Sequence, residues 1–321
     1  MFRLKLVPDD THIEFIKHRK TAVAMSVAAM IGSVIAFFTL GLNFGIDFRG
    51  GVTIEIGDET PIDLAKTREA VGALGLGDVK VQEFGSPNDV VIYIEQQDVQ
   101  SRDENDDEAA QQNAAELVQT ALREALGETI SFRRIDVVGP KVSGELARNG
   151  SIAVGLAVAM MLVYIWLRFE WQFSLGAIAA LVHDVILTIG FFCVTQLEFN
   201  INIIAAILTI VGYSMNDTVV VYDRVRENLR KYKKKPLAEL LDISINETLS
   251  RTLMTSLTTL LALIALFILG GAALSGFTAA MIWGVVIGTY SSVFIASPFL
   301  MATGVKRDWA KVKGEGAPQG A

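Results

Sequence analysis

Ionisable side chains stand inside stretches of the sequence that are otherwise apolar. His183 and Asp184 lie within the stretch 174–195, and Asn216 and Asp217 lie within the stretch 201–221. A charged group at the centre of a membrane helix costs roughly 3 kcal/mol or more, so such residues are functional candidates by default. The chemistry they suggest is reversible binding of a proton or another ion.

Asp217 borders a stripe of small and polar residues that share one helix face. The members of this stripe are Ala205, Thr209, Gly212 and Asn216. The same spacing recurs at the next apolar stretch, with Arg251 directly before it and Thr255, Thr258 and Ala262 within it. Asp217 and Arg251 are expected on the same side of the membrane, where they could meet across the helix pair.

An aspartate near an arginine in a partly dry groove has two competing influences on its charge. The arginine favours the ionised carboxylate, whereas desolvation favours the neutral acid. A conformational change can tip this balance, which is what a proton-binding carboxylate requires. The alternative is a structural salt bridge, or a carboxylate that only reaches the membrane interface.

His183 and Asp184 are secondary candidates for the same path. No basic partner is evident for them, so hydrogen bonding between helices is the favoured interpretation. Gly284 and Gly288 are four residues apart, a spacing that indicates close helix packing.

Motifs for bond-breaking chemistry are absent from the sequence. It contains no nucleotide-binding P-loop, no H-E-x-x-H, no nucleophile elbow and no Cys/His cluster with metal-ligand spacing. The one cysteine, Cys193, cannot form a disulfide within the chain. We therefore expect no enzyme activity, no cofactor and no metal.

The candidate residues must be positioned by membrane helices. Half of the 321 residues are apolar and the mean hydropathy is positive, and a membrane-spanning helix needs about 20 apolar residues. Six stretches qualify, and the first is expected to be an uncleaved signal anchor. They are 21–42, 150–167, 174–195, 201–221, 252–271 and 277–303.

Basic residues predict the orientation of these spans. They gather in segment 1–20, in the connections 168–173 and 222–251, and in the tail 304–321, whereas 196–200 and 272–276 contain none. Both termini are therefore expected in the cytoplasm. After Pro236 the 222–251 connection is amphipathic, which predicts a helix on an anionic membrane surface, with partner docking as the alternative.

Segment 43–149 has the pattern of a folded α/β domain. Strands are expected at 51–56, 79–84, 90–94 and 130–138, and helices at 62–74 and 107–126, with a hairpin turn at 85–88. The order β-α-β-β-α-β is typical of ferredoxin-like domains. The predicted fold is therefore a six-helix membrane bundle with an inserted α+β domain on the outer side of the membrane.

Several segments resemble the SecD/SecF family of bacterial protein-export subunits. They are 44–51 (FGIDFRGG), 138–146 (VGPKVSGEL), 168–171 (RFEW), 183–187 (HDVIL), 211–228 (VGYSMNDTVVVYDRVREN) and 250–260 (SRTLMTSLTTL). They follow in order over nearly the whole chain, and they match the smaller subunit of the family's pair. The resemblance implies half of a transporter of the RND (resistance-nodulation-division) superfamily, with a SecD-like chain as the other half.

The resemblance also implies a function and a site. A subunit of this kind uses the proton motive force in the inner membrane to promote late protein translocation, with Asp217 and Arg251 in the proton path and Asn216 beside them. The implied partners are the SecYEG channel, SecA, YajC, the exported polypeptide and membrane lipid, with no nucleic acid. The alternatives are an RND-type exporter of small molecules or lipids, and an assembly subunit in which Asp217 is only structural.

Overall fold

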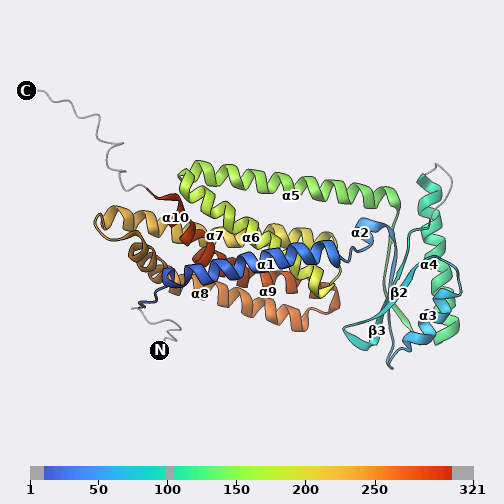
Figure 1. The fold of residues 1–321 in the computed structure, drawn as a ribbon. Helices are drawn as coiled ribbons and strands as arrows, with labels where there is room; N and C mark the ends of the chain where they lie inside the picture. The colour runs from blue at the N-terminus through green and yellow to red at the C-terminus, as the bar shows by residue number, and fades with distance from the viewer. Residues whose placement is uncertain (1–10, 98–103, 306–321) are drawn as a thin grey trace, which may run out of the picture.

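The structure is a computed structural model that describes residues 11–97 and 104–305 (Figure 1). Of the predicted tails 1–20 and 304–321, residues 1–10 and 306–321 lie outside the described residues. The described chain forms a bundle of long helices with a smaller α/β domain at one end. We call this end of the bundle the domain end and the opposite one the distal end.

Six helices of the described chain are long and apolar enough to cross a membrane, which confirms the predicted number of spans. A 3-10 turn at Ile16–His18 leads into the first, and a π-helical turn at Ser292–Ala296 interrupts the last. The helices are α1 (Arg19–Thr39), α5 (Pro140–Arg168), α6 (Trp171–Thr195), α7 (Ile201–Lys231), α8 (Leu237–Leu269) and α9 (Ala272–Ser291), which continues as α10 (Ser297–Thr303).

The expectation of a separate surface helix after Pro236 is wrong. The amphipathic residues form the first part of α8, which runs without a break into the apolar part. Leu240, Leu241 and Ile245 are fully buried in a core that also contains Val225 and Leu229 of α7. Their apolar side is therefore covered by the chain's own helix and not by lipid.

Glycine spacing brings α9 against α7. A Cβ atom on Gly284 would collide with the side chain of Ile210, and one on Gly288 would lie 3.1 Å from the Cα of Ser214. The predicted close packing therefore occurs between these two helices. The π turn precedes Pro298, which has no N–H to continue the regular pattern of the helix.

The inserted domain has the predicted ferredoxin-like order. Its strands form one antiparallel sheet in the order β2-β3-β1-β4. Strand β3 begins four residues earlier than expected, so Gly85, with a φ of 83°, makes the turn almost alone. The elements are β1 (Gly51–Gly57), α3 (Leu64–Gly72), β2 (Val79–Phe84), β3 (Ser86–Ile94), α4 (Glu104–Leu126) and β4 (Ser131–Val138), preceded by the short helix α2 (Ile46–Arg49).

The two faces of the sheet have different surroundings. Helices α3 and α4 cover the face that points away from the bundle, and the other face turns toward the domain end of the bundle (Figure 1). The covered face is apolar, with alternate residues of β1 and β3 such as Ile54 and Ile92 fully buried. The polar side chains of the sheet therefore lie on the face toward the bundle.

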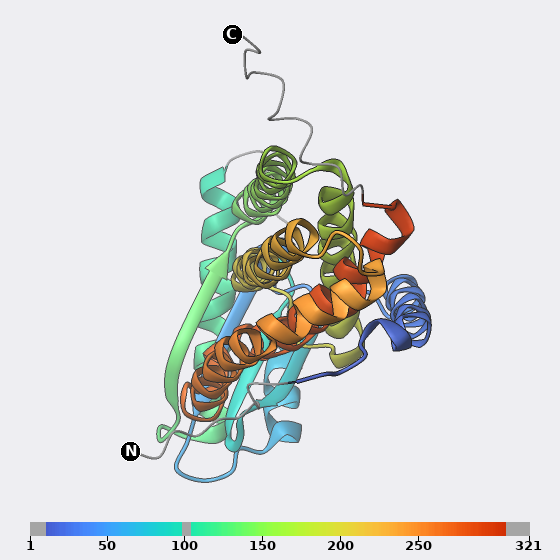
Figure 2. The ribbon, with the colours of Figure 1, turned by 90° about the vertical axis from the view of Figure 1, so that its left-hand side faces the viewer.

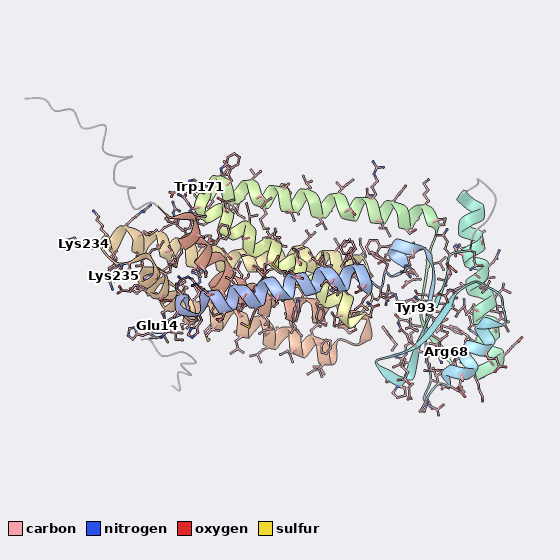
Figure 3. The ribbon with its side chains drawn as sticks, viewed as in Figure 1. Glu14, Arg68, Tyr93, Trp171, Lys234 and Lys235 are labelled. Atoms are coloured by element: carbon pink, nitrogen blue, oxygen red, sulfur yellow. The ribbon has the colours of Figure 1, made fainter. Side chains whose placement is uncertain are left out.

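The connections of the bundle divide between its two ends. The connection between α7 and α8, with Lys234 and Lys235, lies at the distal end, as does Trp171 at the start of α6 (Figure 3). Figure 2 shows the molecule from this distal end, with the inserted domain behind the helices. The long helix α5 starts beside the domain and brings the chain back along the bundle.

Candidate functional site

Asp217 is a buried carboxylate inside the membrane bundle. It lies on α7 and only 3% of it is exposed. Its Oδ2 atom has no hydrogen-bond partner among the described residues. A buried polar atom without a partner is costly, and in a membrane span it points to a functional group.

The expected contact between Asp217 and Arg251 is electrostatic and not a direct ion pair. Arg251 lies on the exposed side of α8, near enough to interact with the carboxylate through space. Within the described chain, no nitrogen of Arg251 comes within 4.0 Å of an Asp217 oxygen. Asn216 is adjacent to Asp217 but exposed. Both neighbours therefore lie at the surface while the carboxylate is covered.

The two polar stripes face outward from this chain. The stripe of α7 is exposed along its length, at Ala205, Thr209, Gly212 and Asn216. The apolar residues on the other side of this helix, including Ile203, Ile207 and Val211, are buried in the core. On α8, Arg251, Thr255, Thr258 and Ala262 are exposed as well. We call this surface of α7 and α8 the open polar face.

Asp184 lies at the centre of a hydrogen-bond network between helices. It is fully buried on α6. His183 Nδ1 lies 2.8 Å from its Oδ1, and its Oδ2 accepts hydrogen bonds from Ser214 Oγ at 2.5 Å and Ser291 Oγ at 2.7 Å. The carboxylate therefore joins α6, α7 and α9, as the interpretation of helix-to-helix hydrogen bonding requires.

His183 extends the network toward α1. Its ring stacks on Tyr290 of α9, with 6.0 Å between the ring centroids. The Tyr290 hydroxyl donates to the carbonyl of Ala22 and lies 3.1 Å from Ser26 Oγ, both on α1. His183 Nε2 is buried and has no partner within the described part of the chain. A chain of polar groups thus connects four helices inside the bundle.

Ser214 and Ser291 are site residues that the sequence did not single out. Ser214 stands three residues before Asp217, one helical turn away, so the Asp184 network ends close to that carboxylate. Serine is common in membrane helices, and only the meeting of α6, α7 and α9 shows which serines reach Asp184. Ser291 is followed directly by the π turn Ser292–Ala296.

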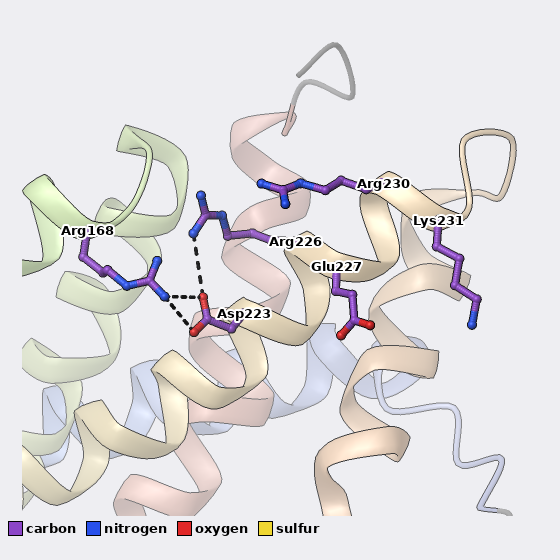
Figure 4. A pocket seen from close by; sticks show the side chains of 6 residues that line it. All are labelled: Arg168, Asp223, Arg226, Glu227, Arg230 and Lys231. Carbon is purple, nitrogen blue, oxygen red and sulfur yellow. Dashed lines mark hydrogen bonds and ion pairs between the residues drawn. The ribbon is translucent and has the colours of Figure 1, made fainter. Parts of the chain in front are cut away.

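An open basic pocket lies at the distal end (Figure 4). Asp223 of α7 accepts two hydrogen bonds of 2.9 Å from Arg168 Nη2 at the end of α5, and Arg226 lies 3.7 Å from it. Glu227, Arg230 and Lys231 line the rest of the pocket. Exposed ion pairs of this kind contribute only about 0–1 kcal/mol to stability. We assign the pair of Arg168 and Asp223 a structural role, because it joins α5 with α7.

Family models match two parts of the chain. The model described as "Protein export membrane protein SecD/SecF, C-terminal" matches residues 117–306. The model of the "SecD/SecF GG Motif" matches residues 35–57, which include the end of α1 and the start of the inserted domain.

Curated relatives resemble the chain over almost its full length. A protein of Cereibacter sphaeroides named "Protein translocase subunit SecF" is 47% identical over 313 residues, which cover 97% of this chain and 95% of that protein. A protein of the same name from Magnetococcus marinus is 49% identical and is covered to 98%.

Solved structures share the fold. The crystal structure of SecDF from Thermus thermophilus, described as a translocon-associated membrane protein, matches 93% of this chain with a TM-score of 0.81 and 32% identity. SecDF in a form called super-membrane-facing matches with a TM-score of 0.67. This chain spans only 39% of the first SecDF chain and 40% of the second. The chain is thus a multi-pass membrane protein that belongs to the SecD/SecF family of protein-export membrane proteins.

Proposed function

We propose that this chain is a subunit of the Sec protein-export machinery that uses the proton motive force to promote late translocation. It would work with a SecD-like partner and carry no catalytic site for hydrolysis. The names of its relatives support the role in export, and the position of Asp217 supports the coupling to protons.

The open polar face is the observation that carries the proposal. Small and polar residues that face lipid would be unfavourable, whereas they permit close packing against another helix. Asp217 is covered just behind this face and Arg251 lies on it. A second bundle packed here would enclose the carboxylate, the guanidinium and Asn216 between two halves. The larger SecDF chain, of which this chain spans about two fifths, supports a partner of that kind.

Charge supports the proposed orientation in the bacterial inner membrane. The distal end carries the basic residues of the α7–α8 connection, including Lys233, Lys234 and Lys235. Basic connections remain in the cytoplasm. The inserted domain would then lie in the periplasm, where it could meet the emerging polypeptide. The channel SecYEG, the ATPase SecA, YajC and surrounding lipid are the further partners of this proposal.

We assign a supporting role to the second polar site. Asp184 and His183 would hold α6, α7 and α9 in register, and Ser214 would connect this network to the helix turn that carries Asp217. A shift of α7 on proton binding would then be transmitted to α6 and α9 through these hydrogen bonds.

Export into inverted membrane vesicles tests the proposal. We expect Asp217→Asn and Arg251→Met to remove the stimulation of export by the proton gradient while the gradient-independent part remains. Collapsing and restoring the gradient with each variant measures this directly. As a control, Asp223→Asn changes an acidic residue of the same helix outside the proposed path. Full gradient dependence in both path variants would refute the coupling.

A further inference from the structure

The connection between α6 and α7 is bound to the segment that enters the inserted domain. Gly45 N–H donates to the Phe199 carbonyl at 3.0 Å, and Phe199 N–H donates to the Asn43 carbonyl at 2.8 Å. Phe44 and Phe48 pack on Phe199, with ring centroids 5.8 and 6.0 Å away. Two segments about 150 residues apart in the sequence therefore form one junction.

The same junction fixes the start of α7. The Asp47 carboxylate of α2 accepts a hydrogen bond of 2.8 Å from Ile201 N–H, at the first turn of α7. A carboxylate at a helix N-terminus is favoured by the exposed N–H groups and the helix dipole. Asp217 lies further along this same helix. The domain entry and the helix with the buried carboxylate are thus mechanically joined.

Glu198 connects this junction to the sheet. Its Oε2 accepts a hydrogen bond of 2.6 Å from the Tyr93 hydroxyl on β3. Its carboxyl group also lies against Gly45, where a Cβ atom would collide with it. Glu198 is therefore held between the domain entry and the sheet face that turns toward the bundle.

The charges around Glu198 are mostly of its own sign. Asp47 of α2, Glu55 of β1 and Asp136 of β4 face this region, and Arg134 of β4 is the basic group among them. Arg134 is already paired with Asp136 at 2.7 Å. A negative charge on Glu198 is therefore poorly compensated, although the Tyr93 hydroxyl stabilises it.

We infer that Glu198 is a positioning residue that holds the inserted domain against the bundle when it is protonated and weakens that hold when it ionises. The claim extends beyond the proposed function, because it concerns the placement of the domain and not the proton path through Asp217.

The direction of the pH effect follows from the linkage between docking of the domain and protonation of Glu198. Partial burial raises the pKa of Glu198 in the docked arrangement, with the Tyr93 hydrogen bond acting in the opposite direction. Burial also raises the pKa of Tyr93, so it stays a neutral donor. A group whose pKa rises on docking stabilises the docked form at low pH. This stabilisation is lost as the pH rises through the pKa that the group has in the docked form.

Distance measurements by electron spin resonance test the inference. Spin labels at Asn113 on α4 and Thr195 on α6, both exposed, are placed in the full chain with its SecD-like partner in lipid nanodiscs, with Cys193→Ala as background. We expect a narrow distribution of distances between the two labels at about pH 5 and a broad distribution at about pH 8. The measurement needs no proton gradient and no export, so its result does not depend on the proposed proton coupling through Asp217.

Three variants give the measurement its specificity. Glu198→Gln should stay narrow at both pH values, because the amide is neutral and still accepts the Tyr93 bond. Tyr93→Phe should broaden the distribution at both. Glu116→Gln, an exposed carboxylate of α4, should behave as the unaltered chain. The inference is overturned if Glu198→Gln keeps the pH response, or if the unaltered chain shows none.

Discussion

At the scale of single residues, two buried carboxylates of the bundle differ in how they are satisfied. Asp184 accepts hydrogen bonds on both oxygens, whereas one oxygen of Asp217 has no partner among the residues that the structure describes, and Arg251 acts on it only at a distance. A buried network whose hydrogen bonds are made holds one structure in place, whereas a buried polar group without hydrogen-bond partners calls for a functional explanation. The two residues therefore have different expected mutational effects.

Replacing Asp184 should destabilise the bundle. In Asp184→Ala the hydroxyls of Ser214 and Ser291 and the His183 ring lose their shared acceptor, which should cost about 1–3 kcal/mol. Asp184→Asn keeps one carbonyl oxygen and should cost less. Thermal unfolding in detergent, followed by tryptophan fluorescence, measures the difference. Equal stability of the alanine variant and the unaltered chain would show that the network does not hold the helices.

At the scale of elements, contact between α7 and α9 forms the centre of the bundle. Gly288 of α9 approaches the backbone of Ser214 on α7, and Gly284 approaches Ile210. This contact places Ser291 near Asp184. Glycine packing between α7 and α9 therefore accompanies the hydrogen bonds that Asp184 makes to both helices.

A larger side chain at this contact should separate the helices. Gly288→Leu places atoms where Ser214 stands and should lower the stability by about 1–3 kcal/mol through overpacking. Gly155→Leu on the exposed side of α5, where nothing lies within 4 Å of an added Cβ, is the matched control. The same unfolding assay should show a lower transition temperature for the first variant alone. Equal transition temperatures for the two variants would show that α7 and α9 do not pack closely at Gly288.

Local patterns in the sequence were enough to predict most elements but not their ends or partners. Apolar runs and strand alternation predicted six spans and the β-α-β-β-α-β order. The ends of α7 and α8 were missed because Lys231 and Leu237 lie in polar turns of helices that continue beyond the apolar part. The surface-helix prediction failed because amphipathicity shows that a face must be covered and not what covers it.

The candidate site was only partly predictable for the same reason. Asp217, Asn216, His183 and Asp184 were predicted because a polar group in an apolar run is conspicuous, and Arg251 because it continues the stripe of the next helix. Ser214 and Ser291 were not, since their role depends on which helices meet. The direction of the polar stripes also required the tertiary structure, which places them on the outside of the chain. The proton path itself stays a prediction.

At the scale of the whole molecule, this chain has the shape of half a transporter. One side of α7 is packed against α9, and its other side, with Gly212, is exposed and polar. The inserted domain is joined to the start of α7 through Asp47 and Glu198. We therefore expect the proton-binding site to be complete only when a partner covers the open polar face.

Proton flux in reconstituted vesicles tests this central claim most directly. A pH-sensitive dye inside the vesicles reports flux through this chain alone, through the chain with its SecD-like partner, and through the pair with Asp217→Asn or Gly212→Leu. We predict flux only for the unaltered pair, because Asn cannot carry the proton and Leu at position 212 blocks the partner's approach. Equal flux through the Asp217→Asn pair, or through the chain alone, would contradict the account.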